Sequence, residues 1–217
     1  MKKIIKIAID SPAAAGAGTQ AKLIAKHYNL FYLDTGKIYR FIGYEKIKNQ
    51  KKFSYKFIKK RIKNLNIKNL KSKKLLSNKV ATEASIIAKD KKIRDIVHAF
   101  QKECAYNPPK KFNGSCLDGR DITYKILPDA DFKFFLTANI KTRAKRRYNE
   151  LKKLNKKIKF IDVLKSIKQR DRSDYKRKIS PLKKTKDSIL IDTTDLSINQ
   201  CFKKIKNIID KGIHQRK

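Results

Sequence analysis

Five short apolar runs alternate along the chain with longer segments whose apolar residues recur at helical spacing. The runs lie at 4–9, 30–33, 115–118, 132–136 and 188–192. Apolar runs of this length predict buried strands, and the segments between them predict helices, among them 20–28, 37–44, 81–103, 143–151, 161–167 and 198–209. Strands that alternate with helices are typical of a parallel sheet covered on both faces. We therefore expect a three-layer α/β fold with a five-stranded parallel sheet.

One long segment does not follow this alternation. Residues 46–82 contain no acidic side chain, and their apolar positions predict a helix followed by a short strand. Because apolar residues recur throughout, we interpret residues 46–80 as a folded insert and not as a disordered tail. The length of 217 residues suits a single domain, 1–217, that carries this insert.

The composition is strongly basic, with 57 lysine and arginine residues against 19 aspartate and glutamate residues, a formal net charge of +38. Of these cations 46 are lysines, spread almost from end to end among many isoleucines and asparagines. This even spread indicates a general compositional bias and not a dedicated nucleic-acid surface. We expect attraction of phosphate-bearing ligands and weak, non-specific nucleic-acid binding at low salt, with no specific nucleic-acid partner.

The cysteines and histidines indicate neither disulfides nor a zinc site. Their spacing is scattered, at Cys104, Cys116, Cys201, His27, His98 and His214. This pattern favours a reducing cytoplasm as the location. No apolar stretch is long enough for a transmembrane helix, and a strand is predicted within a few residues of Met1, so we expect neither a membrane span nor a signal peptide.

The first predicted strand leads through a loop of small residues into a helix, which is the setting of a phosphate-binding P-loop. The expected pattern is G-x-x-x-x-G-K-[ST]. Here Gly16, Gly18 and Thr19 are available, but a serine, Ser11, stands at the first glycine, and an alanine, Ala17, stands at the lysine. Ala14 also replaces a glycine, one that a family resemblance carried by segments further along the chain implies. Glycine tolerates dihedral angles that serine does not, so the sequence alone does not decide the backbone conformation at Ser11.

Three further groups of segments carry a family resemblance. Residues 33–40, then 118–123 with 128–138, then 170–174 with 180–182 and 191–194, resemble segments of bacterial cytidylate kinases. Together with the loop they cover nearly the whole chain in the same order. Any one block is a weak signal, whereas the set at matching spacing is specific.

The resemblance implies a P-loop kinase that passes the γ-phosphate of ATP to CMP or dCMP with Mg²⁺ as cofactor. It implies a monophosphate-binding insert near 46–80, a mobile lid near 150–180 and a monomer. By position, the ATP-phosphate loop is Ser11, Pro12, Ala13, Ala14, Ala15, Gly16, Ala17, Gly18 and Thr19. The CMP site is Thr35, Arg40, Ser85, Arg94, Arg120, Asp121, Arg170, Asp174 and Arg177.

The arginines can also be weighed without the family. Arginine grips phosphate oxygens through a planar fork, which lysine lacks, and phosphoryl transfer depends on positioning and charge stabilisation. In a chain so rich in lysine, an arginine beside a motif block indicates a specific role such as phosphate binding. The alternative for each arginine is an ordinary cation on the surface. We expect four catalytic arginines: Arg120, Arg147, Arg170 and Arg177.

Three carboxylates follow from the same reasoning. Asp118 ends a predicted strand beside the P-loop strand, so with the Thr19 hydroxyl it can hold Mg²⁺, although a turn-capping aspartate is a serious alternative. Asp121 and Asp174 can accept hydrogen bonds from the cytosine amino group or the ribose, or each can fix an arginine by ion pairing.

The missing lysine leaves three hypotheses. Removing a comparable charge contact costs roughly 10³–10⁵ in the rate of phosphoryl transfer. Either another cation replaces it, from Arg143 to Arg147, from Arg170 to Arg177, or a lysine elsewhere; or the enzyme is slow; or the chain binds nucleotides without catalysis. The intact acceptor-side blocks favour a replacement cation.

Two rival functions stay open on the sequence. A kinase for another monophosphate, UMP or AMP, is the rival from the same class. A non-catalytic nucleotide- or RNA-binding protein that uses the +38 charge is the rival from another class.

Overall fold

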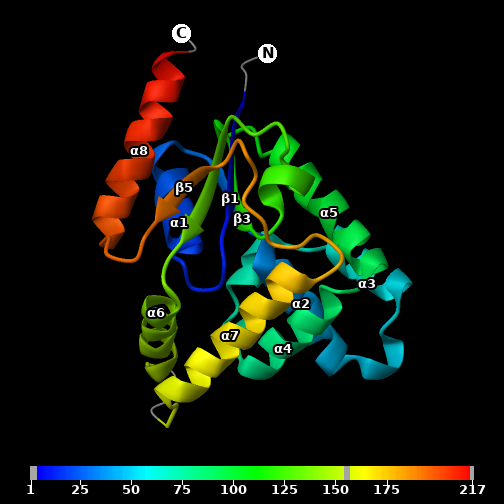
Figure 1. Ribbon diagram of the computed structural model, residues 1–217. Coiled ribbons are helices and arrows are strands. Elements are labelled where there is room, and N and C mark those ends of the chain that lie inside the picture. The colour runs from blue at the N-terminus through cyan, green and yellow to red at the C-terminus, as the bar shows by residue number, and fades with distance from the viewer. Residues whose placement is uncertain (1–3, 154–156, 216–217) are drawn as a thin grey trace.

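The computed structural model describes residues 4–153 and 157–215, and its centre is a parallel sheet (Figure 1). The described strands number five: β1 (Ile5–Asp10), β2 (Phe31–Asp34), β3 (Gly114–Gly119), β4 (Phe132–Thr137) and β5 (Ile189–Asp192). Their order across the sheet is β2-β3-β1-β4-β5, and every neighbouring pair is parallel. The predicted five-stranded parallel sheet is confirmed.

The first strand is the middle of the sheet, since β1 pairs with β3 on one side and β4 on the other. Ile7 lies opposite Cys116 and Phe132 in the two pairings. The consecutive residues Ile7, Ala8 and Ile9 are all fully buried, because helices cover both faces of the sheet. This burial explains why the run is continuously apolar and does not alternate with polar residues.

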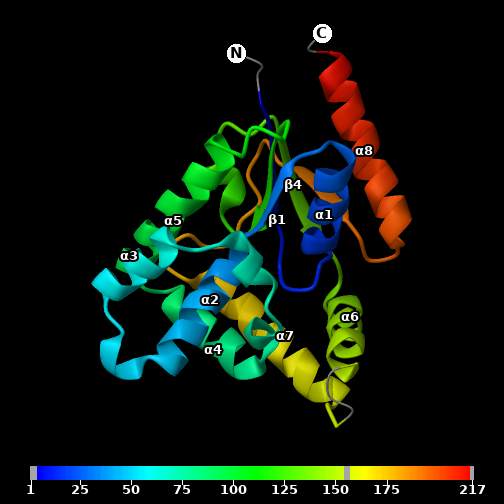
Figure 2. The same ribbon diagram turned by 180° about the vertical axis from the view of Figure 1, so that it is seen from behind.

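Helices α1 (Ala17–His27) and α8 (Ile198–His214) cover one face of the sheet (Figures 1 and 2). Helix α8 begins with a capping box formed by Ser197 and Gln200, and Cys201, Ile205 and Ile209 form its buried stripe at a spacing of four residues. The other face carries α2 (Thr35–Lys48), α3 (Tyr55–Lys63), α4 (Asn78–Ile87) and α5 (Lys91–Tyr106).

The expected strand after α3 is wrong. Residues 67–71 and 73–76 form short 3₁₀ helices, η2 (Ile67–Lys71) and η3 (Lys73–Leu76). Asn66 accepts a hydrogen bond from the backbone N–H of Lys68, and Ser72 accepts one from Lys74. Such side-chain contacts close tight turns and compete with a strand. Leu70 and Leu75 still enter the core that α2 and α5 share, so the insert is folded against the sheet.

Two helices lie beyond the carboxyl ends of the strands, at the end of the molecule opposite the described chain ends (Figure 1). They are α6 (Ile140–Lys152) and α7 (Phe160–Lys176). They pack on each other through Ala144, Val163 and Ile167. No helix within the described ranges is both long and apolar enough to cross a membrane.

Candidate active site

The loop between β1 and α1 ends at an open helix N-terminus. Gly16 is the N-cap of α1, with φ 95° and ψ 0°, and no side chain within the described residues caps the helix. A φ in this range favours glycine. The free backbone N–H groups and the helix dipole make this end an anion-binding site. Helix α1 begins at Ala17, which is three residues before the start predicted from the sequence at residue 20.

The two replaced glycines of the loop have different consequences. Ser11 is buried and has no positive φ, so a serine fits there without backbone strain. Ala14 has φ 60°, in the left-handed region that glycine occupies readily. The alanine thus keeps the glycine-like backbone path at a cost in conformational energy.

Arginine and threonine side chains hold this loop from outside. Arg143 Nη1 donates to the carbonyl oxygen of Ala13 at 3.2 Å and pairs with Asp171 at 2.7 Å. Thr193 Oγ1, at the end of β5, donates to the carbonyl oxygen of Ala15 at 3.0 Å. Contacts to main-chain carbonyls maintain the shape of the loop. Some of its N–H groups donate to carbonyl oxygens, whereas those of Gly16, Ala17 and Gly18 have no backbone acceptor among the described residues and are left for a ligand.

Arg146 reinforces this support, because it donates to Thr193 through Nη1 at 2.9 Å and through Nη2 at 2.5 Å. Arg143 and Arg146 are two of the cations that the sequence offered as replacements for the P-loop lysine. Their guanidinium groups are instead occupied by protein acceptors, Asp171 and the Ala13 carbonyl for Arg143 and Thr193 for Arg146, so neither supplies the missing charge in this conformation.

Asp118 is the penultimate residue of β3 and lies next to the first turn of α1. A Cβ atom placed on Gly18 would lie 3.5 Å from Asp118 Oδ2, and Tyr32 donates its hydroxyl to Asp118 Oδ1 at 2.8 Å. Burial and the nearby charge of Asp34 raise the pKa of Asp118 to about 8. Asp118 and Thr19 line the same cavity. A carboxylate whose charge is this poorly compensated fits Mg²⁺, which takes one or two carboxylates together with substrate phosphates.

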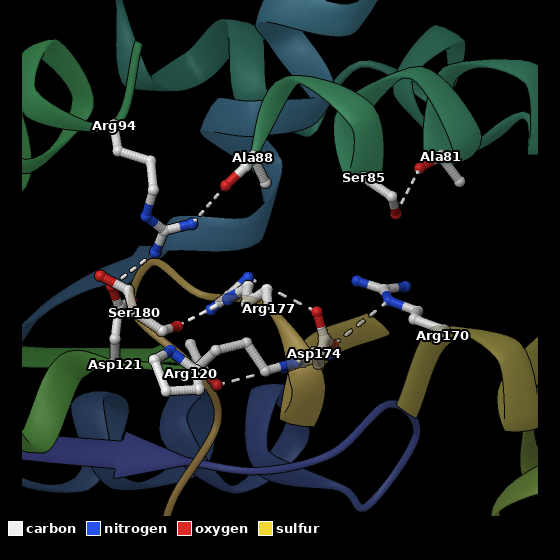
Figure 3. Close-up of polar contacts among 12 residues, drawn as sticks. Ala81, Ser85, Ala88, Arg94, Arg120, Asp121, Arg170, Asp174, Arg177 and Ser180 are labelled. Carbon is white, nitrogen blue, oxygen red and sulfur yellow. Dashed lines mark hydrogen bonds and ion pairs between the residues drawn. The ribbon is translucent and has the colours of Figure 1, made fainter. Parts of the chain in front are cut away.

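Three arginines converge on Asp174 of α7 (Figure 3). Arg120 Nε donates to Asp174 Oδ2 at 2.8 Å, Arg177 Nη1 lies 3.5 Å from Oδ1, and Arg170 Nε lies 3.9 Å from Oδ2. Burial alone would raise the pKa of Asp174, but the charges of Arg120 and Arg170 hold it below its usual value. Burial and repulsion from Arg120 lower the pKa of Arg170 to about 10, so it stays charged at neutral pH.

A second, deeper pair joins α5 to the segment after β3. Arg94 is 1% exposed; it donates to Asp121 Oδ2 at 2.5 Å and to the carbonyl oxygen of Ala88 at 2.9 Å (Figure 3). His98 Nε2 lies 3.0 Å from the same Asp121 oxygen. Burial acts to raise the pKa of Asp121, but His98 and Arg94 together hold it well below its usual range.

Glycine and a buried carboxylate position Arg120 and Asp121. A Cβ atom on Gly119 would lie 2.5 Å from Thr35 Oγ1, so only glycine allows this approach. Asp10, at the end of β1, accepts from the backbone N–H groups of Ile122 and Thr123 at 2.9 Å each. Burial raises the pKa of Asp10 to about 6.

The loop at residues 11–19 and the arginines around Asp174 and Asp121 line one cavity. Its volume is about 510 Å³. The predicted site residues that line it are Ser11, Pro12, Ala14, Ala15, Gly16, Ala17, Gly18, Thr19, Thr35, Arg40, Ser85, Arg94, Asp118, Arg120, Asp121, Arg147, Arg170, Asp174 and Arg177. A neighbouring cavity of about 900 Å³ extends between α4 and α7, and Ala13 lines that one.

Comparison with known proteins identifies the family. A family model described as cytidylate kinase matches residues 7–211. The chain belongs to the cytidylate kinase family. A cytidylate kinase from Bartonella quintana (strain Toulouse) is 42% identical over 209 residues, which cover 94% of each chain. A cytidylate kinase from Clostridium botulinum (strain Okra / Type B1) is 39% identical over 218 residues, which cover 95% of this chain and 98% of that protein.

A solved structure supports the fold of this cytidylate kinase family member. An uncharacterised protein from Eubacterium ventriosum ATCC 27560 has a TM-score of 0.56 at 18% identity, over 96% of this chain and 99% of that one. At this identity the likeness concerns the fold alone.

Not every predicted residue of this family member joins the charge network. Arg40 donates to the carbonyl oxygen of Leu75 at 2.9 Å, and Arg147 pairs with Glu150 at 2.7 Å. Thr35 donates to the carbonyl oxygen of Asp118 at 2.7 Å. Ser85 donates to that of Ala81 at 3.1 Å (Figure 3). These four side chains line the shared cavity from three helices: Thr35 and Arg40 from α2, Ser85 from α4 and Arg147 from α6.

Sequence reasoning missed three residues that shape the site: Asp10, His98 and Thr193. Asp10 was visible as a carboxylate at the end of the first strand, and Thr193 lay within a resemblance block without a role. His98 carried no signal beyond its place on the helix of Arg94. Their partners lie far away in sequence, so only the folded chain shows what they hold.

Proposed function

We propose that the chain transfers the γ-phosphate of ATP to the phosphate of CMP or dCMP. The observation that carries this proposal is the shared cavity, in which the N-terminus of α1 faces four arginines, Arg94, Arg120, Arg170 and Arg177. One anion-binding end and one arginine cluster suit two phosphate groups that must meet. The relatives named cytidylate kinases support cytosine as the base.

In this proposal the loop at residues 11–19 holds the ATP phosphates, chiefly through the backbone N–H groups of Gly16, Ala17 and Gly18 at the start of α1. Thr19 and Asp118 would hold Mg²⁺, which when bound neutralises charge on the β- and γ-phosphates. Asp118 lies where it can do so, because its Oδ2 atom is beside the first turn of α1.

On the acceptor side, arginine side chains position the CMP phosphate for in-line attack on the γ-phosphorus, and ADP leaves. Asp121 and Asp174 orient Arg94 and Arg120, which supports ion pairing as their main role over direct contact with the base. Arg147, Arg170 and Arg177 stabilise the transferring group from α6, α7 and the end of α7, and they exclude water.

We also propose the organisation of the molecule. Residues 1–217 form one domain, residues 46–80 serve as the monophosphate-binding insert, and residues 150–180 serve as a lid that closes over the cavity. The lid helix α7 carries Arg170 and Asp174, which supports a closing role for it. We expect a cytoplasmic monomer with only weak, non-specific nucleic-acid binding.

The test is a coupled assay of ADP formation with CMP, dCMP, UMP and AMP as acceptors, with Mg²⁺ and with EDTA. We expect Mg²⁺-dependent turnover with CMP and dCMP above that with UMP and AMP. The Arg120→Met variant, purified identically, controls for contaminating kinases and should be roughly 10³-fold slower. Absence of turnover with every acceptor would contradict the proposal.

A binding protein for RNA predicts a different result. Its nucleic-acid affinity would stay tight at physiological salt, and calorimetry would show no saturation by CMP. Preference for UMP or AMP in the same assay would instead assign a different acceptor to this fold.

A further inference from the structure

We propose that Lys22 supplies the positive charge that the missing P-loop lysine would bring to the ATP phosphates. The inference rests on the proposed function, and it concerns a residue five positions after Ala17, on the same helix. The motif places a lysine at the first residue of α1, where this chain has a buried alanine. The charge therefore has to come from a side chain that reaches the same helix end.

The other cations around the cavity have partners of their own, and the proposed function already assigns Arg147, Arg170 and Arg177 to the transferring group. Arg94, Arg120 and Arg177 pair with Asp121 or Asp174, and Lys37 lies 4.0 Å from Asp34. The remaining arginines are Arg40, held by the Leu75 carbonyl, Arg147, paired with Glu150, and Arg170, beside Asp174. Lys22 also lines this cavity, and no carboxylate of the described residues forms an ion pair with it.

Helix geometry directs Lys22 toward the phosphate end of α1. Residues 18 and 22 lie on the same helix face, four positions apart. That face points to the metal-binding carboxylate, since a Cβ on Gly18 would lie 3.5 Å from Asp118 Oδ2. Long side chains on a helix lean toward its N-terminus, so the ammonium group of Lys22 projects over the first turn.

The position of the ammonium group agrees with this direction. Lys22 Nζ lies 6.0 Å from the centre of the Tyr32 ring, and Tyr32 donates its hydroxyl to Asp118. Lys22 is exposed and flexible, so its ammonium group is free to move from the Tyr32 ring to phosphate oxygens when ATP binds.

The experiment compares Lys22→Met, Lys22→Arg and the matched control Lys26→Met. Lys26 is exposed one turn further along α1 and does not line the cavity. We expect Lys22→Met to lower kcat about 100-fold and to weaken ATP binding, measured by calorimetry in EDTA, about 10-fold. Lys22→Arg should retain most of both, and Lys26→Met should stay within about twofold of the unmodified protein.

A double variant makes the test specific to the missing lysine. Ala17→Lys should restore activity to Lys22→Met but not to Arg147→Met, which lacks a different cation. The proposal is overturned when Lys22→Met matches Lys26→Met in both kcat and ATP affinity, or when Ala17→Lys raises all backgrounds equally. Should the unmodified protein not phosphorylate CMP, the proposed function fails, and the metal-free ATP affinity still decides the role of Lys22.

Discussion

Two parts of the molecule line the same cavity but are built in different ways. One is the donor loop, residues 11–19. The other is the acceptor cluster, Arg94, Arg120, Arg170 and Arg177 with Asp121 and Asp174. In the loop at residues 11–19 the proposed ligand-binding groups are backbone N–H groups, and Arg143 and Thr193 donate to its carbonyl oxygens from other elements. In the acceptor cluster the proposed binding groups are arginine side chains, and carboxylates hold them in place. A backbone site tolerates changes of side chain as long as its path is kept, whereas a side-chain site does not.

This difference explains where the sequence departs from its family pattern. Ser11, Ala14 and Ala17 all lie in the backbone-built loop, and only Ala17 removes a charged group. The predicted acceptor residues Arg94, Asp121 and Asp174 all take part in ion pairs. Arginine therefore has two distinct tasks in the proposed function: Arg143 supports the donor loop, and the arginines of the acceptor cluster bind the acceptor phosphate.

The largest effect is expected from breaking the deepest acceptor pair. Asp121→Asn leaves Arg94 buried without its carboxylate, which should lower the free energy of unfolding at pH 7 by about 3–5 kcal/mol. The KM for CMP should rise as well, since Arg94 loses its anchor. Urea denaturation and steady-state kinetics measure the two effects.

The same variant makes a prediction for pH. The folded-state pKa of Asp121 lies below its usual value, so the stability from this pair is present above pH about 4 and is lost as the pH falls below that value. The difference in the free energy of unfolding between the variant and the unmodified protein should therefore shrink from about pH 5 to about pH 3, roughly one unit on either side of the usual aspartate pKa. Asp95→Asn is the control, because its pair with Lys91 is exposed and contributes little. An equal difference at every pH would contradict the role of the pair.

A smaller effect is expected from removing a support of the donor loop. Thr193→Val leaves the carbonyl of Ala15 and the guanidinium of Arg146 short of a partner, at a cost of about 1–3 kcal/mol in the free energy of unfolding. The KM for ATP should rise while the KM for CMP stays unchanged. Thr194→Val is the control, since its hydroxyl contacts Asp192 and Asn139 and not the loop. A matching change in the KM for CMP would contradict a role confined to the donor side.

The sequence predicted the sheet well because strand burial leaves a local signal. A continuous apolar run such as 4–9 requires cover on both faces, whatever the partners are. The short strand after α3 was wrong because a strand also requires a neighbour to pair with, and the apolar spacing of Ile67 and Leu70 suits a 3₁₀ turn equally well. The local pattern thus predicts burial more reliably than pairing.

The site followed the same rule. The residues near the strand ends were predictable from position, since parallel strands bring their carboxyl ends to one edge. The tasks of Arg143 and Arg146 were not, because a sequence does not tell whether an arginine meets a phosphate or a carbonyl. Thr193 lies 178 residues from the Ala15 carbonyl that it holds, and only the fold brings them together.

The smallest expected effect tests whether the loop keeps its path at a cost. Ala14 has φ 60°, a conformation that costs an L-residue roughly 1 kcal/mol. Glycine relieves this strain, but it also makes the unfolded chain more flexible. We therefore expect Ala14→Gly to raise the free energy of unfolding by a net amount of about 0.5 kcal/mol. Ala15→Gly is the control, because Ala15 has no positive φ and should lose about 0.5–1 kcal/mol. The KM for ATP should stay within twofold for Ala14→Gly, since the backbone path is unchanged. The Ala14 side chain packs against the apolar cluster between α6 and α7. Equal destabilisation by the two variants would show that this packing contributes more to stability than the backbone strain costs. The loop would then depend on side-chain packing as well as on its backbone path.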